Sequence, residues 1–161
     1  MTDTVALTEF KQGVRMLRDS HPHNALEHFR KAVDLEQHNP YYISFVGVSL
    51  ARAQRKWEPA LKLCELALSM KRNEAQLYLN LAEVYTSAGR REEALITLDR
   101  ALASLGPQAR IQQARLKLGR RRSPALPFLD RQNLLNRYLG ALRHRILGWT
   151  NGSPSLLHHS S

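Results

Sequence analysis

The segment EALITLDRALAS (residues 93–104) shares its pattern of small and large apolar residues with NALEHFRKAVDL (24–35) and PALKLCELALSM (59–70). Three positions recur in all three segments at intervals of 35 and then 34 residues, and two of them are always alanine. They are Ala25, Ala60 and Ala94; Phe29, Cys64 and Leu98; and Ala32, Ala67 and Ala101. Three positions that keep one period along the chain indicate an internal repeat.

Each of these segments has the spacing of a helix, because residues at i, i+4 and i+7 share one helical face. A second apolar-periodic stretch precedes each segment, and breaker-rich turns (DSHPHN, QRKW and AGRR) separate the two. The preceding stretches are 4–18, 41–54 and 75–88. One helical hairpin cannot bury its apolar face alone, whereas three stacked hairpins can. The sequence therefore predicts an all-α solenoid of three helical hairpins.

The 34-residue period and its helix–turn–helix unit resemble the tetratricopeptide repeat. The third unit matches the family pattern of large, small, aromatic and glycine positions best. The matching residues are Tyr78, Leu81, Ala82, Tyr85, Gly89, Ala94, Leu98 and Ala101. In the first unit Gly13 also matches, but in the second Gly47 falls one place early and Arg55 replaces the turn glycine. The resemblance implies three repeats, at 4–38, 41–74 and 75–106.

The resemblance also implies where a partner binds, because such arrays hold partner segments in a groove lined by the first helix of each hairpin. Carried over by position, the groove residues are Leu7, Phe10, Val14, Leu17 and Arg18; Tyr42, Phe45, Ser49, Arg52 and Ala53; and Gln76, Leu79, Glu83, Thr86 and Ser87. The first two sets are largely apolar, which predicts an adaptor for an apolar or amphipathic segment of a partner. The alternatives are that some of these residues belong to the core, or that the chain's own tail covers them.

One known use of this fold is disfavoured by the groove positions. Members that bind chaperones hold a carboxylate with Lys, Asn and Arg at fixed groove positions. In this chain those positions carry Phe10, Val14, Val46, Gln76 and Asn80. Asn80 offers an amide, and no cation is present among them, so a carboxylate clamp of that kind is not expected.

Catalytic and metal-binding patterns are weak in this sequence. His21, His23 and His28 cluster around the first turn, but no carboxylate or thiolate completes a set of metal ligands, and solvated histidines are the better interpretation. The single cysteine, Cys64, occupies the column of Phe29 and Leu98 and is expected to be a buried small apolar residue. Without a phosphate loop or a catalytic triad pattern, we expect neither enzymatic activity nor a cofactor.

The C-terminal third differs from the repeats in charge. Residues 1–106 hold 14 Lys and Arg against 13 Asp and Glu, whereas residues 107–149 hold ten against Asp130 alone. The predicted parts are a capping helix (107–118), a basic connector with two prolines (119–129), an amphipathic helix (130–147) and a disordered tail (148–161). The basic patch comprises Arg120, Arg121, Arg122 and Arg131. The C-terminal part faintly resembles extensions that follow such arrays in small bacterial proteins.

These charges leave two hypotheses about partners open. A protein or peptide partner, acidic where it meets the arginines, is favoured, because few aromatic residues and no nucleic-acid motif accompany the basic excess. The alternative function is a peripheral anchor, in which the basic extension binds an anionic membrane or nucleic acid. The 161 residues contain no apolar run long enough to span a bilayer and no signal-peptide pattern, so a cytoplasmic protein is expected. Partner, pathway and oligomeric state stay open.

Overall fold

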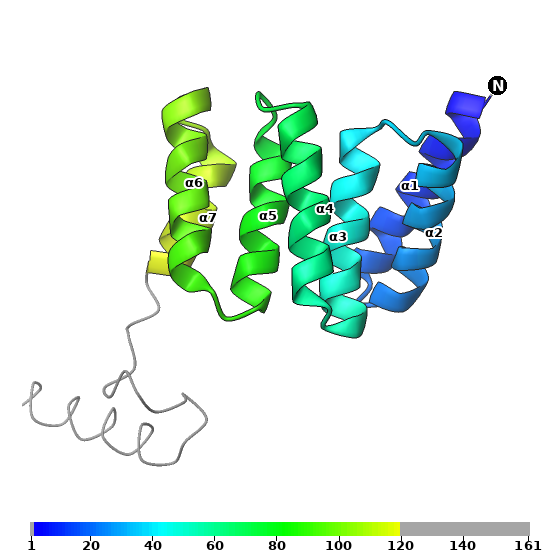
Figure 1. Ribbon diagram of the computed structural model, residues 1–161, viewed down its shortest axis with the longest axis horizontal. Helices are drawn as coiled ribbons and strands as arrows, with labels where there is room; N and C mark the ends of the chain where they lie inside the picture. Colours follow the sequence, from blue (N-terminus) through cyan, green and yellow to red (C-terminus); the bar gives the residue numbers. More distant parts are fainter. Residues whose placement is uncertain (1, 120–161) are drawn as a thin grey trace, which may run out of the picture. The chain divides into compact units, whose positions relative to one another are not determined.

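The computed structural model describes residues 2–119, and these form seven α-helices and no strand (Figure 1). In chain order they are α1 (Thr2–Arg18), α2 (Pro22–Leu35), α3 (Pro40–Gln54), α4 (Trp57–Met70), α5 (Ala75–Ser87), α6 (Arg91–Leu105) and α7 (Ala109–Gly119). The helices pair as the hairpins α1–α2, α3–α4 and α5–α6, and α7 packs on the last of them. The predicted all-α solenoid of hairpins is confirmed.

The two helices of successive hairpins fall into two rows. Helices α1, α3, α5 and α7 form one row, which we call the inner face, and α2, α4 and α6 form the other, which we call the outer face. Along the inner row, α3 and α5 pack closely against each other, and α3 also packs against α2. Helix α5 is therefore buried between both helices of the preceding hairpin and its own partner α6, whereas α3 packs on α2, α4 and α5.

Local sequence explains where several helices begin and end. Pro22 and Pro40 occupy the first helical positions, where the missing N–H costs nothing, and Asn39 caps α3 by accepting a hydrogen bond from the Tyr41 backbone N–H at 3.1 Å. The turn after α5 uses Gly89 at φ 79°, whereas Arg55 takes the left-handed conformation after α3 at φ 54°. The αL conformation that a glycine adopts readily is thus imposed on a non-glycine residue in the second hairpin.

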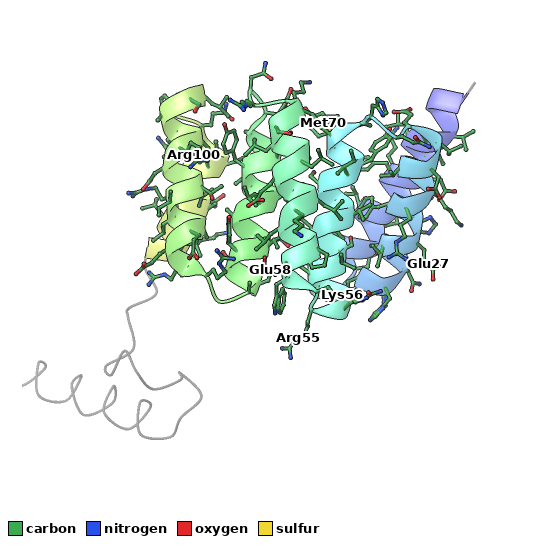
Figure 2. All side chains as sticks on the ribbon, in the orientation of Figure 1. Glu27, Arg55, Lys56, Glu58, Met70 and Arg100 are labelled. Carbon is green, nitrogen blue, oxygen red and sulfur yellow. The ribbon has the colours of Figure 1, made fainter. Side chains whose placement is uncertain are left out.

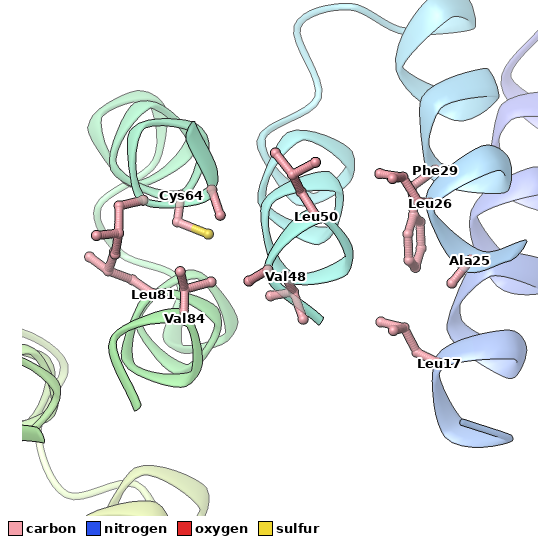
Figure 3. Packing of buried hydrophobic residues seen from close by; sticks show 12 residues of the cluster. Leu17, Ala25, Leu26, Phe29, Val48, Leu50, Cys64, Leu81 and Val84 are labelled. Atoms are coloured by element: carbon pink, nitrogen blue, oxygen red, sulfur yellow. The ribbon is translucent and has the colours of Figure 1, made fainter. Parts of the chain in front are cut away.

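The alanine columns form the spine of the core, and Figure 3 labels three of their nine residues, Ala25, Phe29 and Cys64, in the main cluster of buried side chains. All nine repeating residues of the three segments are 0% exposed. Small side chains at these positions let the two helices of a hairpin approach closely, and the larger residue between them fills the space left over. Gly13 has the same role, because a Cβ placed on it would lie 2.6 Å from the Phe29 ring. The predicted packing through the alanine columns is confirmed.

Helix α7 differs slightly from the predicted capping helix. It begins at Ala109 instead of Pro107 and includes Gly119, which the sequence placed in the connector. Ile111 is its buried residue, and Arg115 forms an ion pair with Asp99 of α6. Arg91 holds the end of the helix, since its Nε donates to the Leu118 carbonyl at 3.0 Å. That contact satisfies a carbonyl that a helix end leaves without an intrahelical partner.

The remaining C-terminal predictions lie outside the described residues. They are the basic patch (Arg120, Arg121, Arg122 and Arg131), the connector beyond Gly119, the helix at 130–147 and the tail at 148–161. Among the helices that the structure does describe, none combines the length and hydropathy needed to cross a bilayer.

Candidate partner-binding face

The apolar part of the inner face lies on α1. Leu7 is 42% exposed, Phe10 and Val14 are half-buried, and Leu17 is buried at 9% exposure. Leu7, Phe10 and Val14 lie at i, i+3 and i+7, so they form one stripe along the helix. Of the five residues predicted from α1, these three and the exposed Arg18 therefore reach the surface, while Leu17 belongs to the core.

An aromatic cluster holds this stripe in place. The Phe10 ring lies 4.8 Å from the ring of Tyr42 and 5.1 Å from that of Phe45, centroid to centroid, and Phe45 lies 5.2 Å from Phe29. These distances are those of favourable aromatic pairs. The structure thus brings Phe10, Tyr42 and Phe45 together, with the first hairpin and α3 joined through rings.

The predicted register of α3 needs a correction. A Cβ on Gly47 would lie 2.8 Å from the Ala60 carbonyl oxygen and 2.8 Å from Cys64 Sγ, so Gly47 faces its hairpin partner just as Gly13 faces Phe29. Gly47 is therefore the structural equivalent of Gly13. Counting from Gly47 moves the groove positions of α3 one residue earlier in the chain than predicted. Three of the residues that it selects, Ser44, Val48 and Ala51, are buried, so this count does not give an open groove either.

Burial removes two of the residues predicted from α3 from the groove. Tyr42 is 5% exposed and Ser49 is 0% exposed, so neither can line an open groove. The Ser49 hydroxyl also has no hydrogen-bond partner within the described part of the chain. Of the residues predicted from α3, Phe45 is half-buried and Arg52 is exposed.

The polar part of the inner face joins α3 to α5. Arg52 donates to the Glu83 carboxylate, with Nε at 2.6 Å and Nη2 at 2.5 Å from Oε1. Both side chains are partly exposed, Arg52 at 43% and Glu83 at 36% relative accessibility. Because Arg52 is already paired with Glu83, this part of the face presents a neutral pair instead of a free cation. Leu79, one turn before Glu83, is half-buried.

A chain of hydrogen bonds runs from the surface of α7 into the core of α3. Arg110 Nη2 donates to Gln76 Oε1 at 2.8 Å, Gln76 Nε2 donates to Asn80 Oδ1 at 2.7 Å, and Asn80 Nδ2 donates to Ser44 Oγ at 2.8 Å. Ser44 in turn donates to the Tyr41 carbonyl at 2.9 Å. Asn80 is 2% exposed and Ser44 is 0% exposed, so the amide is engaged inside the protein.

The contacts of Gln76 and Glu83 add a residue to the inner face that the sequence did not predict. Gln76 and Glu83 reach the inner face as predicted positions, but both are bound by cations of neighbouring helices. Arg110 was not predicted, although it lies 34 residues after Gln76, and one more repeat period would have pointed to it. Ser44 carried no signal in the sequence, because its partner Asn80 is on another helix.

The histidines of the first turn also need a correction. His28 is not simply solvated, because its Nδ1 lies 2.7 Å from Glu9 Oε2 of α1. The pair links α1 to α2. Among the described residues, no group of three or more His, Cys, Asp and Glu side chains is placed to hold a metal ion.

Cys64 is 0% exposed and its Sγ donates weakly to the Ser44 carbonyl at 3.5 Å. Burial, with smaller contributions from Glu83 and Glu65, raises the pKa of its thiol to about 12. Since the thiolate is the reactive form, a thiol reagent at about pH 8 should not modify the folded protein. After denaturation one thiol per chain should react. Rapid modification in native buffer would contradict this burial.

Comparison with known proteins agrees with this fold. Residues 51–118 match the tetratricopeptide repeat family. No curated protein matches the chain significantly in sequence.

Solved structures with a similar fold share little sequence with this chain. The first TPR domain of Spaghetti (RPAP3), bound to the HSP90 peptide SRMEEVD, is 19% identical, with a TM-score of 0.59 over 72% of this chain and 94% of that one. The TPR2B domain of yeast Sti1 in its complex with pHsp70 is 22% identical, with a TM-score of 0.59 over 74% and 99%. The Arabidopsis OM64 TPR domain is 15% identical, with a TM-score of 0.59 over 76% and 100%. At these identities the likeness is one of fold.

Proposed function

The chain is a tetratricopeptide-repeat protein, and we propose that it is a protein–protein interaction adaptor that binds an amphipathic segment of a partner on its inner face. The observation that carries the proposal is the stripe of Leu7, Phe10 and Val14, which stays partly exposed although α1 is otherwise packed on α2. Exposed apolar side chains in a fixed row are typical of a surface that receives a helix or an extended segment.

The two halves of the inner face favour an amphipathic segment over a purely apolar one. Apolar side chains of the partner would lie on α1, where the aromatic cluster keeps Phe10 from moving. Polar side chains of the partner would meet the Arg52–Glu83 pair on α3 and α5, and Arg110 beyond it. A rigid, preformed surface lowers the entropy that binding must overcome.

Structures of similar fold support a peptide as the partner, since the Spaghetti domain holds SRMEEVD from HSP90. An acidic peptide end of that kind is not the partner we propose for the inner face. Phe10 and Val14 are apolar where clamp-type members hold a carboxylate, and the Asn80 amide is engaged by Gln76 and Ser44. The proposed segment therefore differs from those peptides in the apolar residues that it brings to α1.

Replacing Leu7 and Val14 with serine tests the proposal. A partner captured from native cells by the immobilised full chain would be identified, and its affinity measured by titration calorimetry. The double variant should bind it at least about tenfold more weakly, because two apolar contacts worth roughly 1 kcal/mol each are lost. Val5→Ser is the matched control, because Val5 is 53% exposed on the opposite side of α1. This variant should bind the partner with the same affinity as the parent. Equal affinity of the double variant would remove the inner face as the binding surface.

A further inference from the structure

A row of positive charge runs along α1 beside the apolar stripe. Lys11, Arg15 and Arg18 lie at i, i+4 and i+7, so they share one side of the helix, and all three are exposed. We call them the cationic row. It is adjacent to the apolar stripe, because Lys11 lies four residues after Leu7 and Arg18 four residues after Val14. Four residues carry the helix only about 40° past one full turn.

Both rows border one hollow on the surface of α1, which has a volume of about 410 Å³. Phe10 and Val14 provide its apolar lining, and the cationic row and Gln12 provide the rest. No Asp or Glu side chain of the described residues lines it. Because Phe10 and Val14 are half-buried, they leave room for apolar side chains of a partner without projecting far from the surface.

The charges of the cationic row are not neutralised in the part of the chain that the structure describes. None of its three side chains forms an ion pair or a hydrogen bond there. By contrast, Glu9 of the same helix is engaged by His28, and Arg52 of α3 is engaged by Glu83. Asp19, in the turn after α1, does not line the hollow. A carboxylate that approaches the cationic row therefore has no intramolecular pair to displace.

From these observations we infer that the segment bound on the inner face is an acidic amphipathic helix of a partner protein, which lies along α1. The inference rests on the function proposed above and adds the charge and the secondary structure of the segment. Helix α1 lies at one end of the array and packs mainly on α2, which leaves room for a further helix along its open side (Figure 2). The partner's apolar side chains contact the apolar stripe, and its carboxylates pair with the cationic row, because guanidinium groups bind carboxylates in bidentate geometry.

A helix matches this surface better than an extended segment or a peptide end does. Helical side chains at i, i+4 and i+7 are spaced by about 6 Å and then about 4.5 Å along the axis, which is the spacing of the cationic row itself. Side chains on one face of an extended strand are about 7 Å apart and lose this match after two contacts. The carboxylates belong to Asp and Glu side chains of the helix, so no terminal carboxylate is needed.

Two other occupants fit the surface less well. Residues 120–161 contain seven arginines and a single acidic residue, Asp130, so the cationic row repels the chain's own C-terminal part. An anionic membrane also attracts cations, but a helix that lies in a membrane surface buries its apolar side chains in the lipid. Phe10 and Val14 are half-buried in the protein instead.

Three synthetic helical peptides of about 18 residues test the inference with the full chain. They share leucines along one face, and the row next to the leucines carries glutamate, glutamine or lysine. Fluorescence anisotropy should show that the glutamate peptide binds about tenfold more tightly than the glutamine peptide, because each exposed ion pair adds a small gain. The lysine peptide should bind most weakly. Binding of the glutamine peptide measures the apolar contact alone.

Lys11→Gln/Arg15→Gln/Arg18→Gln, the row variant, should lose the preference for the acidic peptide. We expect it to bind the glutamate peptide about tenfold more weakly than the parent does, and no more tightly than the glutamine peptide. Its affinity for the glutamate peptide should also depend less on salt, since the screened charges are gone.

Two further variants separate the cationic row from the net charge and from the apolar contact. Arg120→Gln/Arg121→Gln/Arg122→Gln, the tail variant, removes the same number of positive charges outside α1 and should bind every peptide like the parent. Leu7→Ser/Val14→Ser should weaken the binding of both the glutamate and the glutamine peptide.

The inference is overturned if the glutamate and glutamine peptides bind equally, if no peptide binds, or if the row variant binds like the parent. Equal losses in the row and tail variants would overturn it too, because the peptide would then respond to net charge alone. If Leu7→Ser/Val14→Ser still weakened the glutamine peptide in these cases, the proposed function would stand without its acidic partner. Vesicles of phosphatidylserine and phosphatidylcholine should bind the row and tail variants alike, and a larger loss in the row variant would assign the cationic row to a membrane.

Discussion

Phe29→Ala should lower the free energy of unfolding by about 3–5 kcal/mol, the usual cost of removing a fully buried phenylalanine. The Phe29 side chain is 0% exposed and lies between α1 and α3, with ring centroids 5.5 Å from Phe10 and 5.2 Å from Phe45. Gly13 leaves room for this ring and for little else. Without the ring, the first hairpin and α3 lose the group that they share, and the cavity cannot close unless a backbone moves.

Urea unfolding followed by circular dichroism measures this change. Leu35→Ala is the matched control on the same helix, because Leu35 is 43% exposed. This variant should lower the free energy of unfolding by much less than Phe29→Ala does. The Phe29→Ala protein should also hold the apolar stripe of α1 less firmly, since Phe10 rests on the cluster. Similar midpoints for the two variants would mean that the aromatic cluster does not support the first hairpin.

The core was predictable because a repeat presents the same packing problem three times. Chance similarity is improbable at three columns with one period, and each column lies where the second helix of a hairpin meets its first. Ala60, Cys64 and Ala67 were therefore placed in the core without knowledge of any contact. All three are fully buried.

The groove positions of α3 were less predictable because they depend on an absolute register. Gly13 and Phe29 are 16 residues apart, as are Ala82 and Leu98, whereas Gly47 and Cys64 are 17 apart. The extra residue of the second hairpin lies in α3, because its turn, 55–56, is one residue shorter than the turns at 19–21 and 88–90. Arg55 takes the left-handed conformation in that short turn. On α3, groove positions counted back from the alanine columns therefore differ by one residue from positions counted from Gly47. Tyr42 and Ser49 were assigned to the groove and are buried, and so are Ser44 and Val48, which a count from Gly47 selects. Most of α3 is buried because it packs against helices on several sides.

Side-chain pairs between helices were not predictable from the sequence. His28 and Glu9, Arg52 and Glu83, and Asn80 and Ser44 lie 19, 31 and 36 residues apart. None of these separations equals the repeat period, so nothing in the pattern marks them. Each pair depends on how far one helix is displaced along its neighbour, which the packing of the larger residues determines.

Gly47→Ala should destabilise the protein by about 1–3 kcal/mol, although alanine is the better helix former. A Cβ at this position would lie 2.8 Å from the Ala60 carbonyl oxygen and 2.8 Å from Cys64 Sγ, so α3 and α4 must move apart. Gly119→Ala is the matched control, because a Cβ there would meet nothing within 4 Å. The control should be neutral or slightly stabilising in the same thermal melt.

A double-mutant cycle with Cys64→Ala separates the clash from any other effect of the new methyl group. Cys64→Ala removes Sγ and opens space beside Gly47, so Gly47→Ala should cost less in the Cys64→Ala protein than in the parent. The carbonyl of Ala60 remains, so the relief should be incomplete. If Gly47→Ala instead stabilised the parent, α3 and α4 would be further apart than the structure has them. Gly47 would then not be the structural equivalent of Gly13.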